Sequence, residues 1–152
     1  MLFRRFVAAT TVACSMAVAM AQSGATVMRT FLVGLGSTET AQIAVVNLAN
    51  ASSSGPAASC TGSIAFFNAA GTAIGTAATF TLATGQIASA SLPFASGGGT
   101  AVRILIRGVV TVTRTAGSGV ACTPAATLDT FDSSSGVTNH RYAGEEAISV
   151  EN

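Results

Sequence analysis

The sequence predicts an all-β domain of about 130 residues, folded as a sandwich of two sheets and preceded by a signal peptide. Three observations support this prediction. Segments rich in Val, Ile, Thr and Phe recur at short spacing, and clusters of Gly, Ser, Asn and Pro separate them. No window after residue 21 carries a sustained apolar stripe at helical period. The first residues have the three parts of an export signal.

Residues 1–21 have the pattern of a secretory signal peptide. Two arginines precede an uncharged run over residues 6–20, and the small residues Ala19 and Ala21 form a cleavage site. The run is shorter than the roughly 20 residues that a membrane span needs, so no membrane span is expected. Cleavage would leave a chain that starts at residue 22.

The three cysteines divide between the signal peptide and the rest of the chain. Small residues precede Cys14, as in a lipoprotein site, but Thr11 stands where leucine is usual, so a lipid anchor is not expected. Cys60 and Cys122 form an even pair in a chain directed to an oxidising compartment, which predicts a disulfide. Closing a loop of about 60 residues would stabilise the fold by roughly 4 kcal/mol. Two buried free thiols are the alternative, and neither a metal nor a cofactor is expected.

Charged residues make up only 9% of the chain. After residue 21, five of the seven basic residues remain against six acidic ones, and none of the five is lysine. This balance lacks the basic field that nucleic acids and anionic membranes attract, so neither partner is expected. The resulting surface of small residues suits packing against a partner protein or against copies of the chain, and a simple bias of composition explains it equally well.

Eight strands are expected, at residues 26–33, 41–48, 60–68, 72–82, 86–92, 101–115, 121–132 and 137–142. A tight hairpin is expected at residues 68–71, because Asn and Gly accept the positive φ of such turns, and a similar turn is expected at residues 83–85. The phenylalanines of the mature chain are assigned to the core, with one of them, Phe67, on the outward parity. They are Phe31, Phe66, Phe67, Phe80, Phe94 and Phe131.

The stretch AVRILIRGVVTVTRT, residues 101–115, places arginines inside an apolar run. Arg103 and Arg107 share one face of a strand. The other face, which is expected to be buried, carries Val102, Ile104, Ile106, Val110 and Val112. The two arginines are four residues apart, so they stand about 13 Å from each other and cannot bind one anion together. A solvated face is the favoured interpretation. Contact with an anion or an acidic partner through Arg103 and Arg107 is the alternative.

The last residues, 145–152, form an acidic tail that carries Ile148 and Val150 at strand spacing. The tail is expected to be frayed or loosely docked. Ile148 and Val150 also suit an edge strand of the same sheet, or a strand donated to a neighbouring copy. The chain therefore divides into a signal peptide (1–21), a sandwich domain (22–144) and an acidic tail (145–152).

His140 is the only histidine, so any acid–base mechanism that uses histidine must run through it. Asp132, residues 133–135 and His140 occur in one stretch. Their pattern is that of a hairpin loop and its return strand, without a nucleophile motif. The sequence also lacks the pattern of paired carboxylates that glycoside cleavage needs and the pattern of a phosphate-binding loop. No catalytic residue is therefore assigned, and the chain is not expected to be an enzyme.

Four segments, AQIAVVNLA, CTGSIAFFNAAGTAIGTAATFTLATGQIASASLP, AVRILIRGVVTV and CTPAATLDTFDSSSGVT, cover most of the mature chain. Together they resemble an uncharacterised set of small secreted bacterial proteins with an immunoglobulin-like β-sandwich. The resemblance implies a sandwich of about 7–9 strands in a periplasmic, secreted or cell-surface protein. It implies a non-enzymatic module for partner binding or cell-surface structure, with no catalytic residue carried over. A pilin-like or fibre-forming subunit assembled by strand addition is the first alternative, and a secreted hydrolase is the second.

Overall fold

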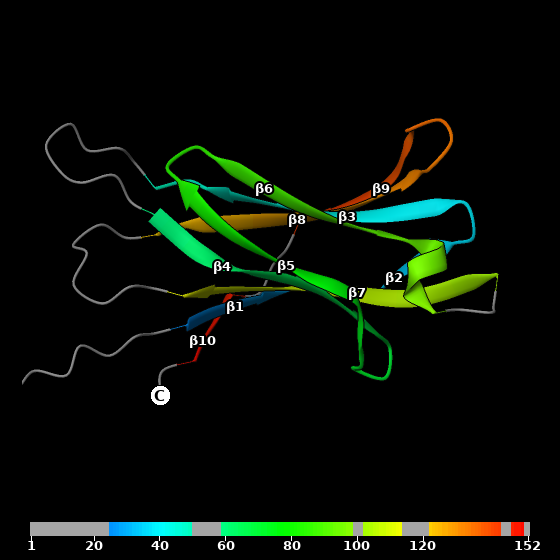
Figure 1. The fold of residues 1–152 in the computed structure, drawn as a ribbon, viewed down its shortest axis with the longest axis horizontal. Helices are drawn as coiled ribbons and strands as arrows, with labels where there is room; N and C mark the ends of the chain where they lie inside the picture. Colours follow the sequence, from blue (N-terminus) through cyan, green and yellow to red (C-terminus); the bar gives the residue numbers. More distant parts are fainter. Residues whose placement is uncertain (1–24, 50–58, 99–101, 114–121, 144–146, 151–152) are drawn as a thin grey trace, which may run out of the picture.

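The computed structural model describes residues 25–49, 59–98, 102–113, 122–143 and 147–150. They are nearly all β and form two antiparallel sheets, which pack as the two layers of a sandwich (Figure 1). The predicted all-β sandwich is confirmed at this level. Within these ranges, no helix has the length and the apolar character that a membrane crossing requires. The signal peptide, Cys14 and Arg114 lie outside the described residues.

Sheet A contains β1 (Ala25–Arg29), β2 (Val33–Gly36), β4 (Ser59–Asn68), β5 (Ala73–Ala83), β7 (Arg103–Thr113) and β10 (Ala147–Val150). Its spatial order is β10-β1-β7-β4-β5, and β2 also pairs with β7. Sheet B contains β3 (Glu39–Asn47), β6 (Ile87–Pro93), β8 (Pro124–Asp132) and β9 (Thr138–Ala143) in the order β6-β3-β8-β9. A short 3₁₀ turn, η1 (Phe94–Gly97), follows β6.

The β4–β5 hairpin turns at Asn68, as the sequence predicts. The backbone carbonyl of Asn68 accepts from Gly71 N at 3.0 Å, its side-chain oxygen accepts from Thr72 N at 2.9 Å, and Gly71 adopts a φ of 80°. The second predicted turn also forms, and Gly85 adopts a φ of 76° there. However, it joins β5 of sheet A to β6 of sheet B. It therefore carries the chain from one sheet to the other instead of closing a hairpin.

A β-bulge ends β1 at Arg29, inside the single strand predicted at residues 26–33, and β2 begins at the last residue of that range. Arg29 pairs with Val109 and Val33 pairs with Ile106, so three residues of this chain segment face two residues of β7. The side chain of Thr30 fixes the bulge, because its Oγ1 accepts from the backbone N–H of β7 residue 108 at 2.8 Å.

The bulge exposes two apolar side chains. Phe31 is 63% exposed and Leu32 is 53% exposed. The assignment of Phe31 to the core is therefore wrong. The reason is that the extra residue of the bulge interrupts the alternation of the strand, so that both side chains face solvent.

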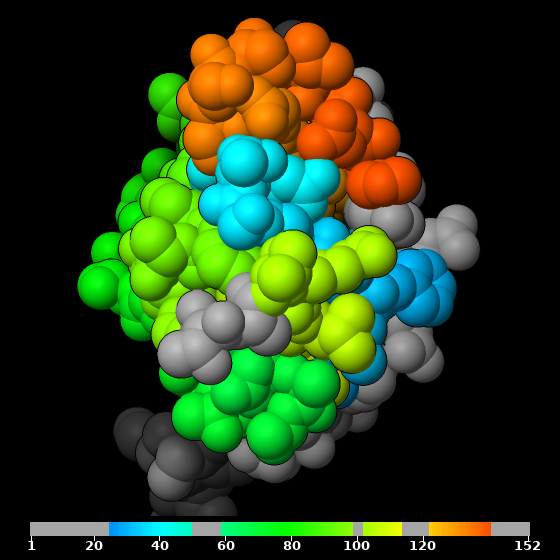
Figure 2. Space-filling model, turned by 90° about the vertical axis from the view of Figure 1, so that its right-hand side faces the viewer, coloured from blue at the N-terminus to red at the C-terminus, as the bar shows by residue number. Residues whose placement is uncertain are grey.

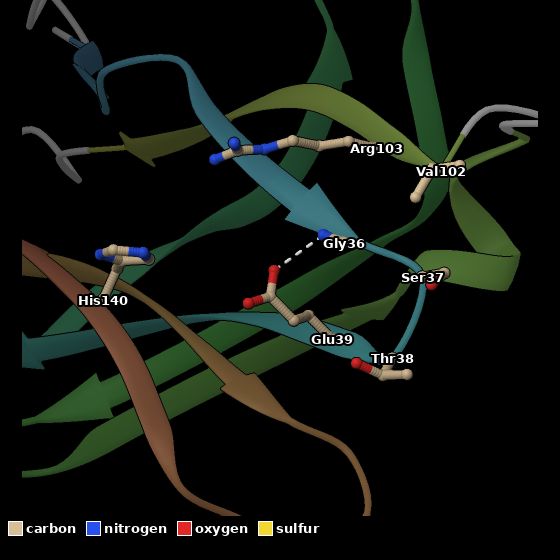
Figure 3. A pocket seen from close by; sticks show the side chains of 7 residues that line it. All are labelled: Gly36, Ser37, Thr38, Glu39, Val102, Arg103 and His140. Atoms are coloured by element: carbon tan, nitrogen blue, oxygen red, sulfur yellow. Dashed lines mark hydrogen bonds between the residues drawn. The ribbon is translucent and has the colours of Figure 1, made fainter.

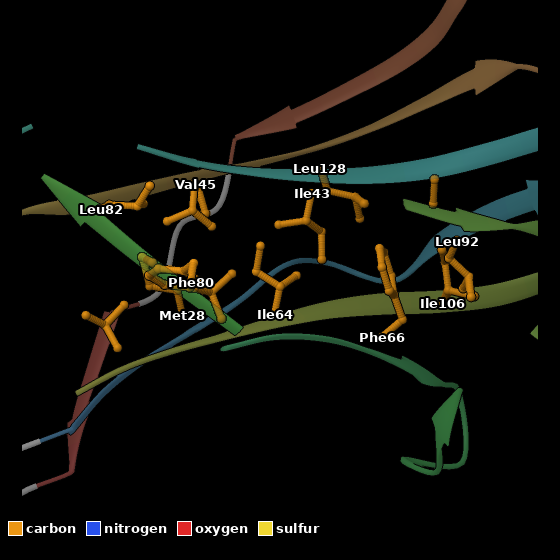
Figure 4. Close-up of a cluster of buried hydrophobic side chains, with 14 of the residues drawn as sticks. Met28, Ile43, Val45, Ile64, Phe66, Phe80, Leu82, Leu92, Ile106 and Leu128 are labelled. Carbon is orange, nitrogen blue, oxygen red and sulfur yellow. The ribbon is translucent and has the colours of Figure 1, made fainter. Parts of the chain in front are cut away.

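Elsewhere the strands bury alternate residues between the sheets, as the parity of the sequence predicts. In β7, Ile106, Val110 and Val112 are buried, whereas Arg103 and Leu105 are exposed. The assignment of Val102 to the buried face is wrong, because this residue precedes β7 and is 83% exposed. The buried side chains of both sheets meet in one core (Figure 4). Its larger members are Met28, Val33, Leu35, Ile43, Val45, Ile64, Phe66, Phe80, Leu82, Leu92, Ile106, Val110, Val112 and Leu128.

A disulfide joins Cys60 to Cys122 across the sandwich, with 5.4 Å between the two Cα atoms. Cys60 lies in β4 of sheet A, and Cys122 lies two residues before β8 of sheet B. Both are buried, with 0% and 7% of their surface exposed. The bridge therefore links the two layers inside the core.

The acidic tail adds an edge strand to its own sheet. β10 pairs antiparallel with β1, and the register places Ile148 opposite Val27 and Val150 opposite Ala25. Of the alternatives for the tail, the chain adopts the edge strand. Ile148 and Val150, which were considered as a donated strand, therefore pair with β1 of their own chain. β2 follows β1 along the same side of β7. Among the described residues β2 pairs with β7 alone, so it is an edge strand as well.

Candidate functional site

A pocket of about 400 Å³ opens at the end of the sandwich where the β2–β3 turn approaches the start of β7 and the middle of β9. Figure 2 looks onto this end, with the β2–β3 region in cyan, β7 in yellow-green and the β8–β9 hairpin in orange. The lining combines a carboxylate, a guanidinium, an imidazole and small polar groups. These residues are Gly36, Ser37, Thr38, Glu39, Val102, Arg103 and His140 (Figure 3).

Glu39 stands at the beginning of β3, and two hydrogen bonds fix its carboxylate. Oε2 accepts from the backbone N–H of Gly36 at 2.7 Å, and Oε1 accepts from Nδ2 of Asn139 at 2.7 Å. The first bond closes the β2–β3 turn, and the second ties this turn to β9. The carboxylate is therefore held in one orientation, and each oxygen retains a lone pair that can accept a further donor.

Arg103 crosses β2 on the outer face of sheet A because β2 has the sequence VGLG. Arg103 is the register partner of Gly36, and its guanidinium passes over Gly34. A Cβ at Gly34 would stand 1.9 Å from Nε of Arg103, so no side chain larger than hydrogen leaves this path open. Among the described residues, no hydrogen bond or ion pair joins Arg103 to another side chain, although Glu39 lines the same pocket.

Arg107 has different surroundings from Arg103, so the two arginines do not form one stripe. Its guanidinium lies over the ring of Phe67, its register partner on β4, at 5.9 Å from the ring centroid. Its Nε is buried without a hydrogen-bond partner among the described residues. In the strand register the bulge lies opposite residues 107–108 of β7, and Leu105, 51% exposed, is two residues from Arg107 on the same strand.

These side chains form a second candidate surface on the outer face of sheet A. It combines a held guanidinium with aromatic and aliphatic side chains, which is the composition of many protein-binding surfaces. We call this surface the bulge patch. Its residues are Phe31, Leu32, Phe67, Leu105 and Arg107.

The stretch that brings Asp132, three serines and His140 together is a structured hairpin loop. Oδ1 of Asp132 accepts hydrogen bonds from the backbone and the hydroxyls of both Ser134 and Ser135. These serines therefore cap a turn, and the carboxylate is directed at them. His140 lies on β9 and lines the pocket beside Arg103.

We expect the Asp132 turn to give a pH-dependent contribution to stability. Hydrogen bonds from Ser134 and Ser135 hold the pKa of the Asp132 carboxyl well below its usual range, which is about 3.9 in an unfolded chain. Because folding lowers the pKa of this carboxyl, its ionised form stabilises the fold at pH values above the pKa of the unfolded chain. This contribution is lost as the pH falls from the unfolded-state pKa through the folded-state pKa. Thermal unfolding at pH 7, 4 and 2 tests this. The melting temperature of the wild type is expected to exceed that of Asp132→Asn at pH 7, and the difference between the two melting temperatures is expected to shrink below about pH 4. A difference that stays constant with pH would contradict this account.

Sequence reasoning missed Glu39, Gly34 and the bulge residues. Glu39 carries no motif, and its role depends on a turn bond and on Asn139, which is 100 residues away along the chain. The glycines of VGLG were the available signal, since two glycines at alternate positions of a strand leave one of its faces without side chains.

In comparisons with known proteins, no protein-family model matches the chain, and no curated protein and no solved structure gives a significant match.

Proposed function

We propose that the protein is an exported, non-enzymatic β-sandwich module that binds a partner protein through the bulge patch. The signal-peptide pattern of residues 1–21 and the buried disulfide support export to the periplasm, the medium or the cell surface. The observation that carries the binding proposal is the exposure of Phe31 and Leu32 side by side, in the bulge that lies opposite residues 107–108 of β7.

Exposed apolar side chains of this size rarely cluster without a function. Phe31, Leu32 and Leu105 are each more than half exposed, and the pairing of β1 and β2 with β7 brings them to one region of sheet A. Covering such side chains removes apolar surface from water, which stabilises a complex. The bulge that presents them is fixed by Thr30, so the surface is formed before any partner arrives.

Arg107 is also oriented in advance. Its guanidinium lies over Phe67, and one of its Nη atoms is 3.6 Å from the position of a Cβ at Gly71 in the β4–β5 turn. An arginine held in this way loses little conformational entropy when it binds a carboxylate. Arginine and aromatic residues are also the types that most often contribute the largest share of binding energy.

The charges of sheet A indicate an acidic partner. The described strands of this sheet contain Arg29, Arg103 and Arg107, and none of them contains an acidic residue. A second pocket of about 350 Å³, lined by the β4–β5 turn, η1 and the start of β7, adjoins the patch at Leu105. The expected partner surface therefore combines carboxylates with an apolar side chain that enters this pocket.

Site-specific photocrosslinking in the cells that make the protein tests this proposal. A benzophenone amino acid is placed at Phe31 in one variant and at Ile87 in another. Ile87 is the matched control because it is an equally exposed apolar residue, at 68%, on an edge strand of the other sheet. We expect a discrete protein adduct from position 31, none from position 87, and a several-fold lower yield from position 31 after Arg107→Gln.

The mass of the adduct separates the two binding modes. An adduct with a different protein supports partner binding. An adduct with a second copy of the chain would replace this proposal with self-assembly, for which the edge strand β10 is the element that two copies could exchange. Equal adducts at both positions, or none at position 31, would overturn the role of the bulge patch.

The immunoglobulin-like type of the sandwich also belongs to this proposal. In the immunoglobulin nomenclature, β1 and β2 together correspond to strand A, and β3 to β8 correspond to B, C, C′, E, F and G. Three pairs then agree with that type. They are β3–β6 as B–E, β4–β7 as C–F and β4–β5 as C–C′. The outer strands differ, because β1 lies beside β7 and β8 lies beside β3. In this arrangement the strands A and G have exchanged sheets relative to the immunoglobulin order.

A further inference from the structure

We infer that the pocket lined by Glu39, Arg103 and His140 binds a small zwitterion that carries a primary ammonium and a carboxylate, such as a free α-amino acid. This inference concerns a site separate from the bulge patch and does not depend on the partner-binding proposal. It rests on two opposite charges that line one pocket of about 400 Å³ and do not pair with each other.

Glu39 provides the cation-binding side of the pocket. Its two hydrogen bonds, from Gly36 N and from Asn139 Nδ2, occupy one lone pair of each oxygen and fix the plane of the carboxylate. The oxygens can therefore accept further N–H donors without any rearrangement. A primary ammonium supplies three such donors. A quaternary ammonium supplies none, and no Phe, Tyr or Trp ring lines the described pocket to bind one by its face.

Arg103 provides the anion-binding side. Its side chain extends across the glycine positions of β2 toward the space that Glu39 and His140 also face (Figure 3). A guanidinium has a planar pair of donors that fits a carboxylate in a bidentate manner. Since Arg103 has no hydrogen-bond or ion-pair partner among the described side chains, binding a carboxylate breaks no existing contact with them.

The two charges together select the class of ligand. A simple anion would be attracted by Arg103 but repelled by the fixed negative charge of Glu39. A simple cation would be attracted by Glu39 but repelled by Arg103. A zwitterion satisfies both groups at once. Val102 is the one large apolar residue of the lining, so most of the contact with the ligand is polar, and a small hydrophilic molecule fits better than a lipid or an aromatic compound.

Amide chemical shifts give a direct test. The backbone N–H of Gly36 is bonded to Glu39, so its signal in a ¹H–¹⁵N correlation spectrum reports on the pocket. The ¹⁵N-labelled protein, recovered from the cells that make it, is titrated with glycine, with N-acetylglycine and with glycinamide. We expect saturable shifts at residues 36–38 with glycine and about tenfold or more weaker binding of either single-charge analogue.

Two substitutions connect the shifts to the proposed groups. Arg103→Gln changes an exposed side chain, so it leaves the fold intact, and it is expected to remove the response to glycine. Glu39→Gln keeps an acceptor for Gly36 and is expected to weaken glycine binding while leaving N-acetylglycine binding unchanged or stronger. Arg29→Gln is the matched control, since Arg29 is an exposed arginine of the same sheet outside the pocket.

Three results would overturn the inference. They are the absence of saturable shifts at residues 36–38 with glycine, binding of N-acetylglycine as tight as that of glycine, and equal loss of the response in Arg29→Gln and Arg103→Gln. Failure of this test leaves the crosslinking result at Phe31 unaffected, because the two sites share no residue.

Discussion

Replacing both Cys60 and Cys122 with alanine is expected to lower the free energy of unfolding by about 4 kcal/mol. The bridge spans 62 residues along the chain, and in the chain-entropy model its loss gives the unfolded chain more conformations. Domains of this kind have a free energy of unfolding of roughly 5–15 kcal/mol, so the change removes a large share of it. Urea unfolding followed by circular dichroism measures the difference.

The double variant is expected to fold, because other contacts place the segment that contains Cys122. Leu48 N donates to the carbonyl of Thr123 at 2.8 Å, and Oδ1 of the buried Asn47 accepts from Thr123 N at 3.4 Å. Wild type under reducing conditions is the control, and its urea midpoint should fall close to that of the double variant. If the oxidised wild type and the double variant unfold at the same urea concentration, the bridge does not contribute to stability in this way.

The features that the sequence predicts correctly are local ones. The alternation in β7 depends on neighbouring residues alone, and it places Ile106 in the core and Arg103 outside. The β4–β5 turn depends on Asn68 and Gly71, whose conformational preferences are intrinsic. Such features follow from one segment of chain, so a single sequence carries enough information to identify them.

The features that it does not predict depend on distant segments. The sequence predicts one continuous strand at residues 26–33, and this strand is interrupted because Thr30 bonds to the backbone of β7, 78 residues later. The order of strands in each sheet is decided in the same way, by pairings between distant segments that no local pattern specifies. The exposure of Phe31 is a consequence of this pairing, so it could not be read from composition.

The candidate pocket illustrates the same limit. The sequence identifies Arg103 as a possible anion contact, but the opposite charge of the pocket, Glu39, comes from a different sheet. The turn from β2 to β3 brings Glu39 there, and the bare face of Gly34 lets Arg103 reach across. Arg103 could therefore be predicted from the sequence as an arginine in a strand. Glu39 could be identified as its counterpart only from the fold.

Gly108→Ala is expected to destabilise the fold by about 1–3 kcal/mol, because the sheets interdigitate at this position. A Cβ on Gly108 of β7 would stand 2.2 Å from Cδ1 of Ile43, which projects from β3 of the opposite sheet. Ile43 is completely buried and belongs to the core. Nothing compensates for the overlap unless Ile43 or one of the sheets moves. Urea unfolding of the variant measures the cost.

Ile43→Val removes Cδ1, the nearer of the two Ile43 atoms that the new methyl group would meet, which makes a specific rescue possible. Alone, this change is expected to cost about 0.5–1.5 kcal/mol, as the loss of one buried methyl group usually does. The double variant Gly108→Ala/Ile43→Val is nevertheless expected to be more stable than Gly108→Ala, because the added Cβ fills the space that Cδ1 leaves. Residues in direct contact give such non-additive changes, whereas separated residues give changes that add. Strict additivity of the two single changes would therefore show that β3 and β7 do not pack against each other at this point.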